Sequence, residues 1–190
     1  MCIRDRYSLI EFESSGEIVK NSQSARWTLS FTPIDDERRK VLAVGPNYYL
    51  GVSTYLAKET EFTTVSDVDQ PGVRVVGVAG TATIRSAEKT LRHTSIKPID
   101  TLDDAVSLFR NGEVDAVALG KESILSLAQT IPGTHAVAGH FHEAGTAVVA
   151  PPAHRGAINA ASRAIEVLKA DGTIRRIFDA NGMAHADVAP

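Results

Sequence analysis

Residues 73–119 constrain the fold of this chain more than any other part of the sequence. They contain three β-rich runs, at residues 73–78, 95–99 and 114–119, and a helical pattern follows each of the first two runs. Strands that alternate with helices predict a parallel sheet with helices packed on its faces. The expected fold class is therefore α/β.

The end of the first predicted strand is also the first candidate binding site. Gly80 and Thr81 stand where the strand meets the next helix. Ligands of open α/β sheets sit outside the carboxyl ends of strands, and free N–H groups at a helix N-terminus attract anions. Thr81 is therefore the leading candidate to hydrogen-bond a carboxylate, with Gly80 and Ala82 beside it. An ordinary helix N-cap is the alternative, and both roles are compatible.

Composition excludes several classes of protein. The chain has 190 residues, a net charge of -3 and scattered basic residues, which argues against nucleic-acid binding. No apolar run approaches the length of a membrane span. Cys2 is the single cysteine, so we expect no disulfide framework and no zinc cluster. We also expect no other metal and no cofactor. His140 and His142 form an H-x-H pattern, but two histidines are not specific for a metal and favour a polar surface.

Local patterns predict further elements outside this stretch. Residues 27–34 look strand-like, and Pro33 predicts that this strand ends there or lies at an edge. Asp35 is expected to cap a short helical turn at residues 36–40. A turn is expected at residues 45–47, between two short strands.

The C-terminal quarter holds the clearest amphipathic helix, at residues 155–169. Its apolar face is formed by Ile158, Ala161, Ile165 and Leu168, at helical spacing. Gly172 fits a left-handed helix end, and Thr173 is expected to cap a last helix at residues 174–180. Residues 184–190 are expected to form a frayed tail.

Six segments that follow one another along residues 12–183 resemble a single family. They read FESSGEIV, WTLSFTPIDDERRK, NYYLGVSTYLA, DQPGVRVVGVAGTA, FRNGEVDAVAL and LKADGTIRRIF. They are similar to the amino-acid-type solute-binding proteins of bacterial ABC transporters, which have the type II periplasmic binding fold. The resemblance implies two α/β lobes joined by two crossing strands. Lobe 1 would comprise residues 7–50 and 146–183, and lobe 2 residues 51–145.

The function implied by this resemblance is capture without chemistry. A small polar, carboxylate-bearing solute would bind between the lobes, and the closed protein would deliver it to a membrane permease. The implied protein is extracytoplasmic, either periplasmic or lipid-anchored, monomeric and not an enzyme. Two alternatives share the fold. One is a dehydratase acting on prephenate-like acids, which needs a positioned general acid or base, and the other is the effector or sensor domain of a regulator.

The resemblance also bears on individual site residues. Arg38 matches the arginine that holds the ligand α-carboxylate in amino-acid-binding relatives, and a guanidinium fork suits that task; a solvated surface charge is the alternative. Tyr48 is a candidate for stacking on the solute, with core or hinge packing as its alternative. Relatives commonly carry an acidic residue for the ligand ammonium near Gly120. This chain departs from that pattern with Lys121 and Glu122.

The beginning of the chain has a resemblance of its own. Residues 1–6 read MCIRDR, which resembles a translated sequencing adapter; a natural start is the alternative. The adapter interpretation implies that lobe 1 lacks its opening strand–helix units. It also implies that a signal peptide would belong to the segment before residue 7.

Overall fold

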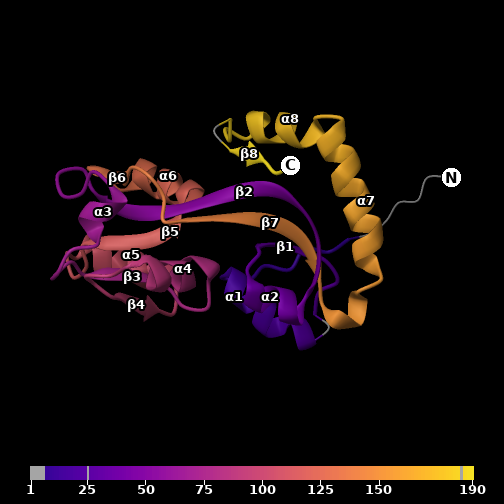
Figure 1. Ribbon diagram of the computed structural model, residues 1–190, viewed down its shortest axis with the longest axis horizontal. Helices are drawn as coiled ribbons and strands as arrows, with labels where there is room; N and C mark the ends of the chain where they lie inside the picture. Colours follow the sequence, from indigo (N-terminus) through magenta and orange to yellow (C-terminus); the bar gives the residue numbers. More distant parts are fainter. Residues whose placement is uncertain (1–6, 25, 185) are drawn as a thin grey trace.

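A computed structural model describes residues 7–24, 26–184 and 186–190, so the expectation for residues 1–6 lies outside the described residues. Figure 1 shows two bodies joined by two long strands, β2 (Ala43–Lys58) and β7 (His142–Ala150). The body that we call lobe 1 contains α1 (Ser15–Lys20), η1 (Asn21–Gln23), β1 (Ser30–Pro33), α2 (Asp36–Val41), η2 (Pro152–His154), α7 (Ala157–Ala170), α8 (Thr173–Ala180) and β8 (Asp187–Val188). The body that we call lobe 2 contains α3 (Val65–Val68), β3 (Val75–Val78), α4 (Ala82–Thr90), β4 (Ile96–Ile99), α5 (Leu102–Arg110), β5 (Ala116–Gly120), α6 (Lys121–Thr130) and β6 (Thr134–Ala136).

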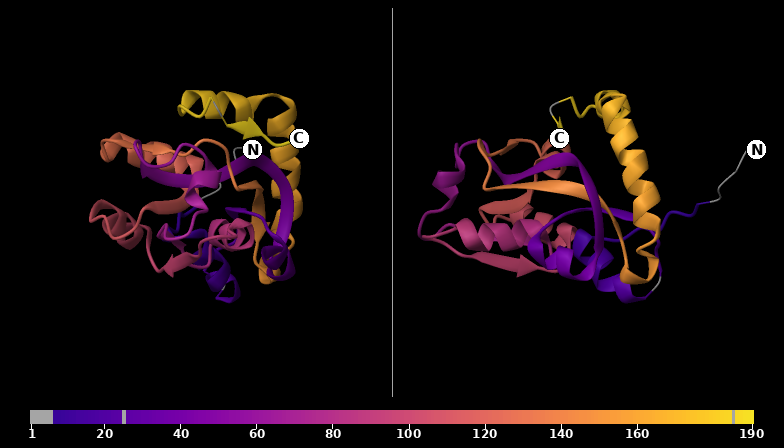
Figure 2. Two further views of the ribbon diagram at one scale, coloured as in Figure 1. Left: turned by 60° about the vertical axis from the view of Figure 1, so that its left-hand side comes forward. Right: turned by 45° about the vertical axis from the view of Figure 1, so that its right-hand side comes forward.

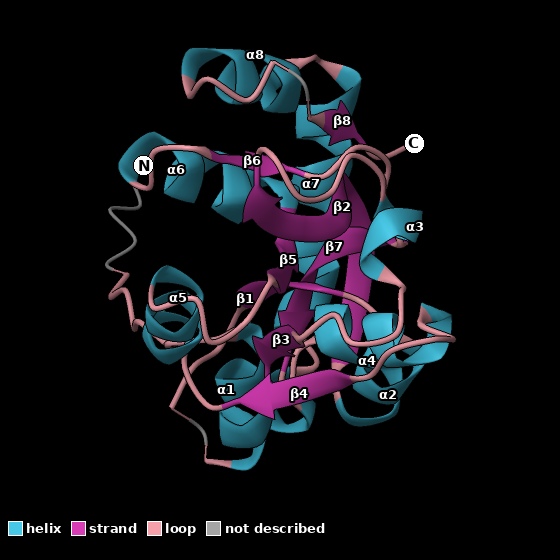
Figure 3. Cartoon of the chain, turned by 90° about the vertical axis from the view of Figure 1, so that its left-hand side faces the viewer, coloured by secondary structure: helices cyan, strands magenta, loops and turns pink. Residues whose placement is uncertain are grey.

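The sheet of lobe 2 confirms the predicted parallel arrangement. Strand β3 pairs in parallel with both β4 and β5, and these strands lie between α4 and α5 in Figure 3. Phe109 of α5 belongs to the apolar cluster on one face of the sheet, and Ile84 of α4 belongs to the cluster on the other. The β3 strand is buried along its whole length, as expected for a strand covered on both faces.

The two lobes share one sheet because β2 and β7 run through both. The strands of the described residues follow the order β1-β7-β2-β5-β3-β4, and β6 and β8 also pair with β2. The turn expected at residues 45–47 is wrong, since these residues lie inside the continuous β2 strand. Pro46 has no N–H to donate to the ladder, and the β2–β7 register shifts between Val44 and Tyr49. The sequence signal therefore marks an irregularity in a strand that β7 holds extended on both sides.

Lobe 1 confirms several local predictions. Strand β1 is at the end of the strand order and finishes at Pro33, as predicted for a proline-containing edge strand. Helix α7 stands across the end of the molecule formed by lobe 1 (Figure 2). The four residues of its predicted apolar face, Ile158, Ala161, Ile165 and Leu168, all join one apolar cluster. No helix in the described parts of the chain combines the length and apolarity that a membrane crossing requires.

The C-terminal segment differs from the sequence prediction in two respects. Gly172 adopts the expected left-handed conformation, with φ 74°, but it is itself the N-cap of α8, so Thr173 belongs to the helix and does not cap it. The Asp171 carboxylate accepts the Thr173 backbone N–H at 2.8 Å in place of a threonine cap.

The expected frayed tail is also wrong for the described residues of the C-terminus. Residues 187–188 form β8, which pairs with β2 at Tyr49 and Leu50. Ala186 and Ala189 are buried, and the Arg175 guanidinium donates hydrogen bonds to the carbonyl oxygens of Met183 and Ala186. The segment is ordered because it covers apolar surface of β2 and because one arginine binds its backbone.

Candidate functional site

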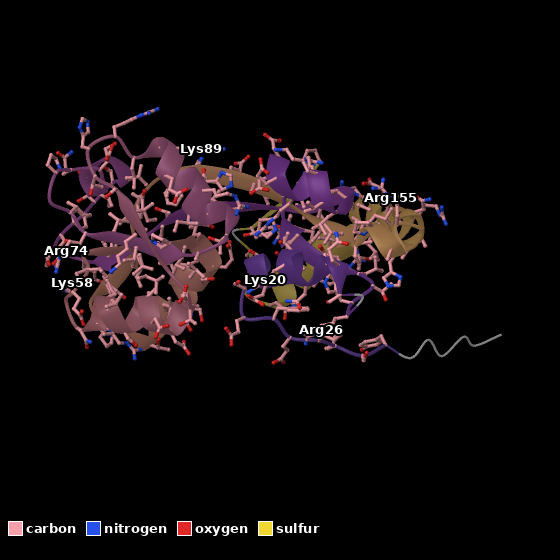
Figure 4. All side chains as sticks on the ribbon, turned by 90° about the horizontal axis from the view of Figure 1, so that it is seen from below. Lys20, Arg26, Lys58, Arg74, Lys89 and Arg155 are labelled. Carbon is pink, nitrogen blue, oxygen red and sulfur yellow. The ribbon has the colours of Figure 1, made fainter. Side chains whose placement is uncertain are left out.

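A cavity of about 690 Å³ lies where lobe 1 approaches lobe 2, between α1 and α2 on one side and the start of α4 and α5 on the other. Figure 1 shows α1 and α2 facing the end of α4 at this seam. Charged residues of both signs line the cavity: Glu13, Glu17, Glu37 and Asp100 are acidic, and Lys20, Arg38 and Arg85 are basic. In Figure 4 the labelled basic side chains are spread over both lobes, and Lys20 lies near the seam.

Arg38 is the most deeply buried charged residue among those lining the cavity. Asp35 accepts the Arg38 backbone N–H at 2.9 Å, which confirms its predicted role as the cap of α2 and fixes where the side chain begins. Only 2% of Arg38 is exposed, so the alternative of a solvated surface charge is wrong. The sequence pattern misses this burial because a run of charged residues on a short helix is typical of exposed turns.

The Arg38 guanidinium is only partly occupied by the protein. It donates to Thr32 Oγ1 at 2.7 Å, to the Pro33 carbonyl oxygen at 2.5 Å and to Ser15 Oγ at 2.8 Å. Its Nε is buried and has no acceptor among the described residues. Burial lowers the pKa of Arg38 to about 10, with Asp35 opposing this effect, so the side chain keeps its charge at neutral pH. A buried charged donor without an acceptor suits an anionic ligand.

Thr81 occupies the N-cap of α4. Its hydroxyl accepts the Ile84 N–H at 3.2 Å and donates its own proton to the Val78 carbonyl oxygen at 2.8 Å. The capping alternative is therefore observed, and a solute contact remains a prediction that requires the hydroxyl to turn. Gly80 precedes it with φ 70° and lines the cavity, whereas Ala82 is buried in the first turn of the helix.

The lobes touch directly at two glycines. A methyl group placed on Gly16 of α1 would lie 3.0 Å from the Gly80 carbonyl oxygen. The start of α1 therefore rests on the turn that carries Thr81. Sequence analysis did not single out Gly16, because its local context of Ser14 and Ser15 reads as an ordinary helix start.

An ion pair joins the lobes beside this contact. Arg85 of α4 donates from Nε to the Asp35 carboxylate at 3.0 Å, and a second bond from Nη2 reaches the same oxygen. Arg85 also donates from Nη1 to the Gly80 carbonyl oxygen at 3.0 Å. Burial raises the pKa of Asp35, but the hydrogen bonds from Arg85 and from the Arg38 N–H outweigh it, so the net shift is downward. Sequence analysis missed Arg85, which has no distinguishing local pattern.

Two other predicted features lie elsewhere. Tyr48 packs its ring against Phe31 and Phe178, with centroid distances of 5.4 and 6.4 Å, and it is not among the residues lining this cavity. Glu122 lies near Tyr49, where burial and that carboxylate raise the pKa of the tyrosine. These ring contacts agree with the alternative of core or hinge packing for Tyr48. A role of Tyr48 in binding the solute stays a prediction.

The H-x-H pair is split by the fold. His140 is exposed, but His142 begins β7 half-buried, opposite Ser53 of β2, and burial lowers its pKa. The Nε2 atom of His142 has no partner in the described part of the chain. Nowhere in residues 7–24, 26–184 and 186–190 do three His, Cys, Asp or Glu side chains gather to hold a metal ion.

Comparison with known proteins identifies solved structures that share the fold of this chain. No protein-family model and no curated protein sequence matches this chain. A mutant of ArgBP from T. maritima superposes with a TM-score of 0.76 at 16% identity, over 90% of this chain and 76% of that one. The substrate-binding protein AbpA of Streptococcus pneumoniae, solved with L-arginine, gives 0.74 at 20% identity, over 86% and 71%. An ancestral amino acid-binding protein, described as a precursor of cyclohexadienyl dehydratase, gives 0.72 at 18%, over 86% and 73%.

These likenesses extend over most of the chain at low identity, so they concern the fold. The chain has the α/β fold of the type II periplasmic binding proteins, in agreement with the sequence prediction. Its structural neighbours include amino-acid substrate-binding proteins of ABC transporters.

Proposed function

We propose that this chain is an extracytoplasmic solute-binding protein that holds an amino-acid-like solute between its lobes for an ABC importer. The proposal includes the lobe boundaries expected from the sequence, residues 7–50 with 146–183 and residues 51–145. It also includes a membrane permease as the partner of the closed form. The fold and the character of its structural neighbours support a binding role, and the site supports the class of solute.

The observation that carries the proposal is the buried guanidinium of Arg38. It is charged, it lines the interlobe cavity, and its Nε–H lacks an acceptor among the described residues. A buried donor without an acceptor is costly, and a carboxylate oxygen would satisfy it with a charge-assisted hydrogen bond. A cavity of about 690 Å³ is within the usual size range of small-molecule sites.

The remaining charges around the cavity favour a zwitterion over a plain acid. Glu13 and Asp100 are exposed cavity-lining carboxylates for which no ion pair is seen within the described residues. Lys20 pairs with Glu17, and Arg85 pairs with Asp35. Carboxylates therefore remain free to face a positive group, while Arg38 is free to face a negative one.

Matched pairs of solutes test the carboxylate requirement. L-arginine and agmatine, L-histidine and histamine, and L-phenylalanine and 2-phenylethylamine each differ by one α-carboxylate. In a thermal-shift screen, we expect stabilisation only from carboxylate-bearing members, because a ligand at 100 times its Kd stabilises the folded state by about 2.7 kcal/mol. A screen in which none of the common amino acids or small carboxylic acids raises the unfolding temperature would contradict the proposal.

Substitution of the anchor completes the test. Arg38→Lys retains the charge but loses the planar fork, so the preference for the carboxylate-bearing member of an active pair should shrink. Arg39→Lys is the matched control, since Arg39 is the exposed neighbour in the same helix. Each variant is compared with its own solute-free form, which removes any effect on intrinsic stability.

The same solutes distinguish binding from catalysis. A binding protein returns its solute unchanged, whereas an enzyme of the dehydratase type would consume a suitable acid. Mass spectrometry after prolonged incubation of the protein with each stabilising solute is expected to recover the intact compound. Turnover would instead favour the enzymatic alternative.

A further inference from the structure

Asp35 and Arg85 belong to opposite lobes, on either side of the seam. Asp35 precedes α2 in lobe 1, and Arg85 lies in the second turn of α4 in lobe 2. Two guanidinium nitrogens of Arg85 donate to the same oxygen of Asp35, Nε at 3.0 Å. Any motion that separates the lobes at this point must break both bonds.

Each residue of the pair also holds one half of the candidate site. The second oxygen of Asp35 accepts the Arg38 N–H at 2.9 Å, so the carboxylate positions the helix that carries the buried arginine. Arg85 donates to the Gly80 carbonyl oxygen at 3.0 Å, so the guanidinium positions the turn before Thr81. One ion pair therefore fixes the distance between the proposed anchor of the solute and the opposite wall of the cavity.

We propose that Asp35 and Arg85 form an interlobe clasp that populates the closed arrangement without any solute. They act as positioning residues, because neither needs to contact the solute to influence how tightly it is held. A protein whose binding-competent form is already populated binds more tightly by the gain in that population. The conformational part rests on geometry alone, and its effect on affinity rests on the proposed function.

The surroundings of the pair favour a measurable contribution. The side chains are 30% and 21% exposed for Arg85 and Asp35, so both are partly shielded from water. Two donors of one guanidinium converge on a single carboxylate oxygen, and hydrogen bonds between charged groups are stronger than those between neutral groups. Loss of a partly shielded pair of this kind is expected to lower the closed-to-open ratio about fivefold.

Pulsed electron resonance on the full chain tests the clasp directly. Spin labels at Arg39→Cys in α2 and Glu88→Cys in α4, both exposed positions, report the interlobe distance after Cys2→Ser removes the single thiol of the chain. No solute is present, so the outcome is independent of the proposed function. Arg85→Gln and Asp35→Asn should each shift the distance distribution to longer values and broaden it. Asparagine retains the ability to cap α2, so Asp35→Asn leaves that role in place.

Matched substitutions separate the clasp from a general effect of charge. Arg92→Gln and Asp36→Asn make the same charge changes at exposed neighbouring positions and should leave the distribution unchanged. The double variant Arg85→Gln with Asp35→Asn should shift the distances no further than either single variant, because one interaction is lost in each case. Circular dichroism of each variant confirms that it is folded. An unchanged distribution in folded Arg85→Gln would overturn the proposal.

A second measurement separates the clasp from the site. For any solute that stabilises the chain, Arg85→Gln should raise Kd about fivefold while the preference for a carboxylate persists, because Arg38 is untouched. Longer interlobe distances in Arg85→Gln, together with no solute binding by the parent protein, would support the clasp and reject the proposed function. Unchanged distances in Arg85→Gln, together with solute binding by the parent protein, would reject the clasp and support the proposed function.

Discussion

Gly16 and Gly80, which are far apart in the sequence, lie in contact across the seam between the lobes. A methyl group on Gly16 would be 3.0 Å from the Gly80 carbonyl oxygen, closer than ordinary van der Waals contact. Gly80 also needs its own lack of a side chain, because its φ of 70° is in the left-handed region. The pair therefore permits a backbone approach that larger residues would prevent, directly beside the Asp35–Arg85 clasp.

Gly16→Ala is expected to open the lobes without unfolding the chain. The added methyl group presses on a backbone atom of lobe 2, while alanine is more favourable than glycine within a helix by about 1 kcal/mol. The interlobe distance between labels at Arg39→Cys and Glu88→Cys should lengthen, and the unfolding temperature should hold or rise. Gly156→Ala is the control, since its new methyl group would meet no described atom within 4 Å outside the local backbone. A distance distribution that matches the parent protein would contradict this account of the contact.

The elements of lobe 2 could be predicted from sequence because their signals are local. Hydrophobic runs, the caps at Thr81 and Thr101 and the helix end before Gly112 all act within a few residues. The turn expected at residues 45–47 failed for the same reason. A glycine–proline–asparagine triplet favours a turn locally, whereas pairing with β7 holds it extended, and pairing partners are not visible in a local pattern.

The site was predictable only in part. The resemblance singled out Arg38, the strand-to-helix pattern singled out Gly80, and both residues line the cavity. Burial of Arg38 depends on hydrogen bonds that its guanidinium donates to Ser15 and Thr32. The helix that carries Arg38 is held to lobe 2 by Arg85, fifty positions from Asp35. Such long-range contacts follow from how the lobes meet. Neither periodicity nor residue type carries that information.

Phe109→Ala is expected to destabilise lobe 2 severely. The ring is 1% exposed and packs in the apolar cluster that includes Leu56, Val117 and Ile124. Removing a buried phenylalanine ring leaves a cavity. We expect the free energy of unfolding to fall by about 3–5 kcal/mol. Urea denaturation followed by circular dichroism measures the loss. Val167→Ala, at a residue 62% exposed, should change the free energy of unfolding by less than about 0.5 kcal/mol.

Asp115→Asn is expected to reduce the decrease in the free energy of unfolding that occurs as the pH falls. A side-chain hydrogen bond from Arg74 holds the pKa of Asp115 below its usual value of 3.8, although partial burial opposes the shift. A carboxyl group with a lowered folded-state pKa stabilises the protein above its unfolded pKa. That contribution is lost as the pH falls through the folded value. Urea titrations between pH 7 and pH 3 should show a smaller loss of stability in the variant, and Asp103→Asn, an exposed position, should retain the parent slope.

Arg175→Met is expected to release the C-terminal segment from the body of lobe 1. The guanidinium donates to the Met183 carbonyl oxygen at 2.9 Å and to that of Ala186, and methionine keeps most of the apolar stem while removing both donors. Strand β8 pairs with Tyr49 and Leu50 of β2, so its release should speed hydrogen exchange at those residues. Exchange in lobe 2 should be unaffected, since the hydrogen bonds of the Arg175 guanidinium go to Asp179, Met183 and Ala186, which all belong to the C-terminal part of the chain. Arg176→Met supplies the control, because the guanidinium of that neighbouring arginine donates to Asp171 and Thr173 near the start of α8. Equal exchange rates at Tyr49 in the parent and in Arg175→Met would mean that burial of Ala186 and Ala189 alone holds the segment in place.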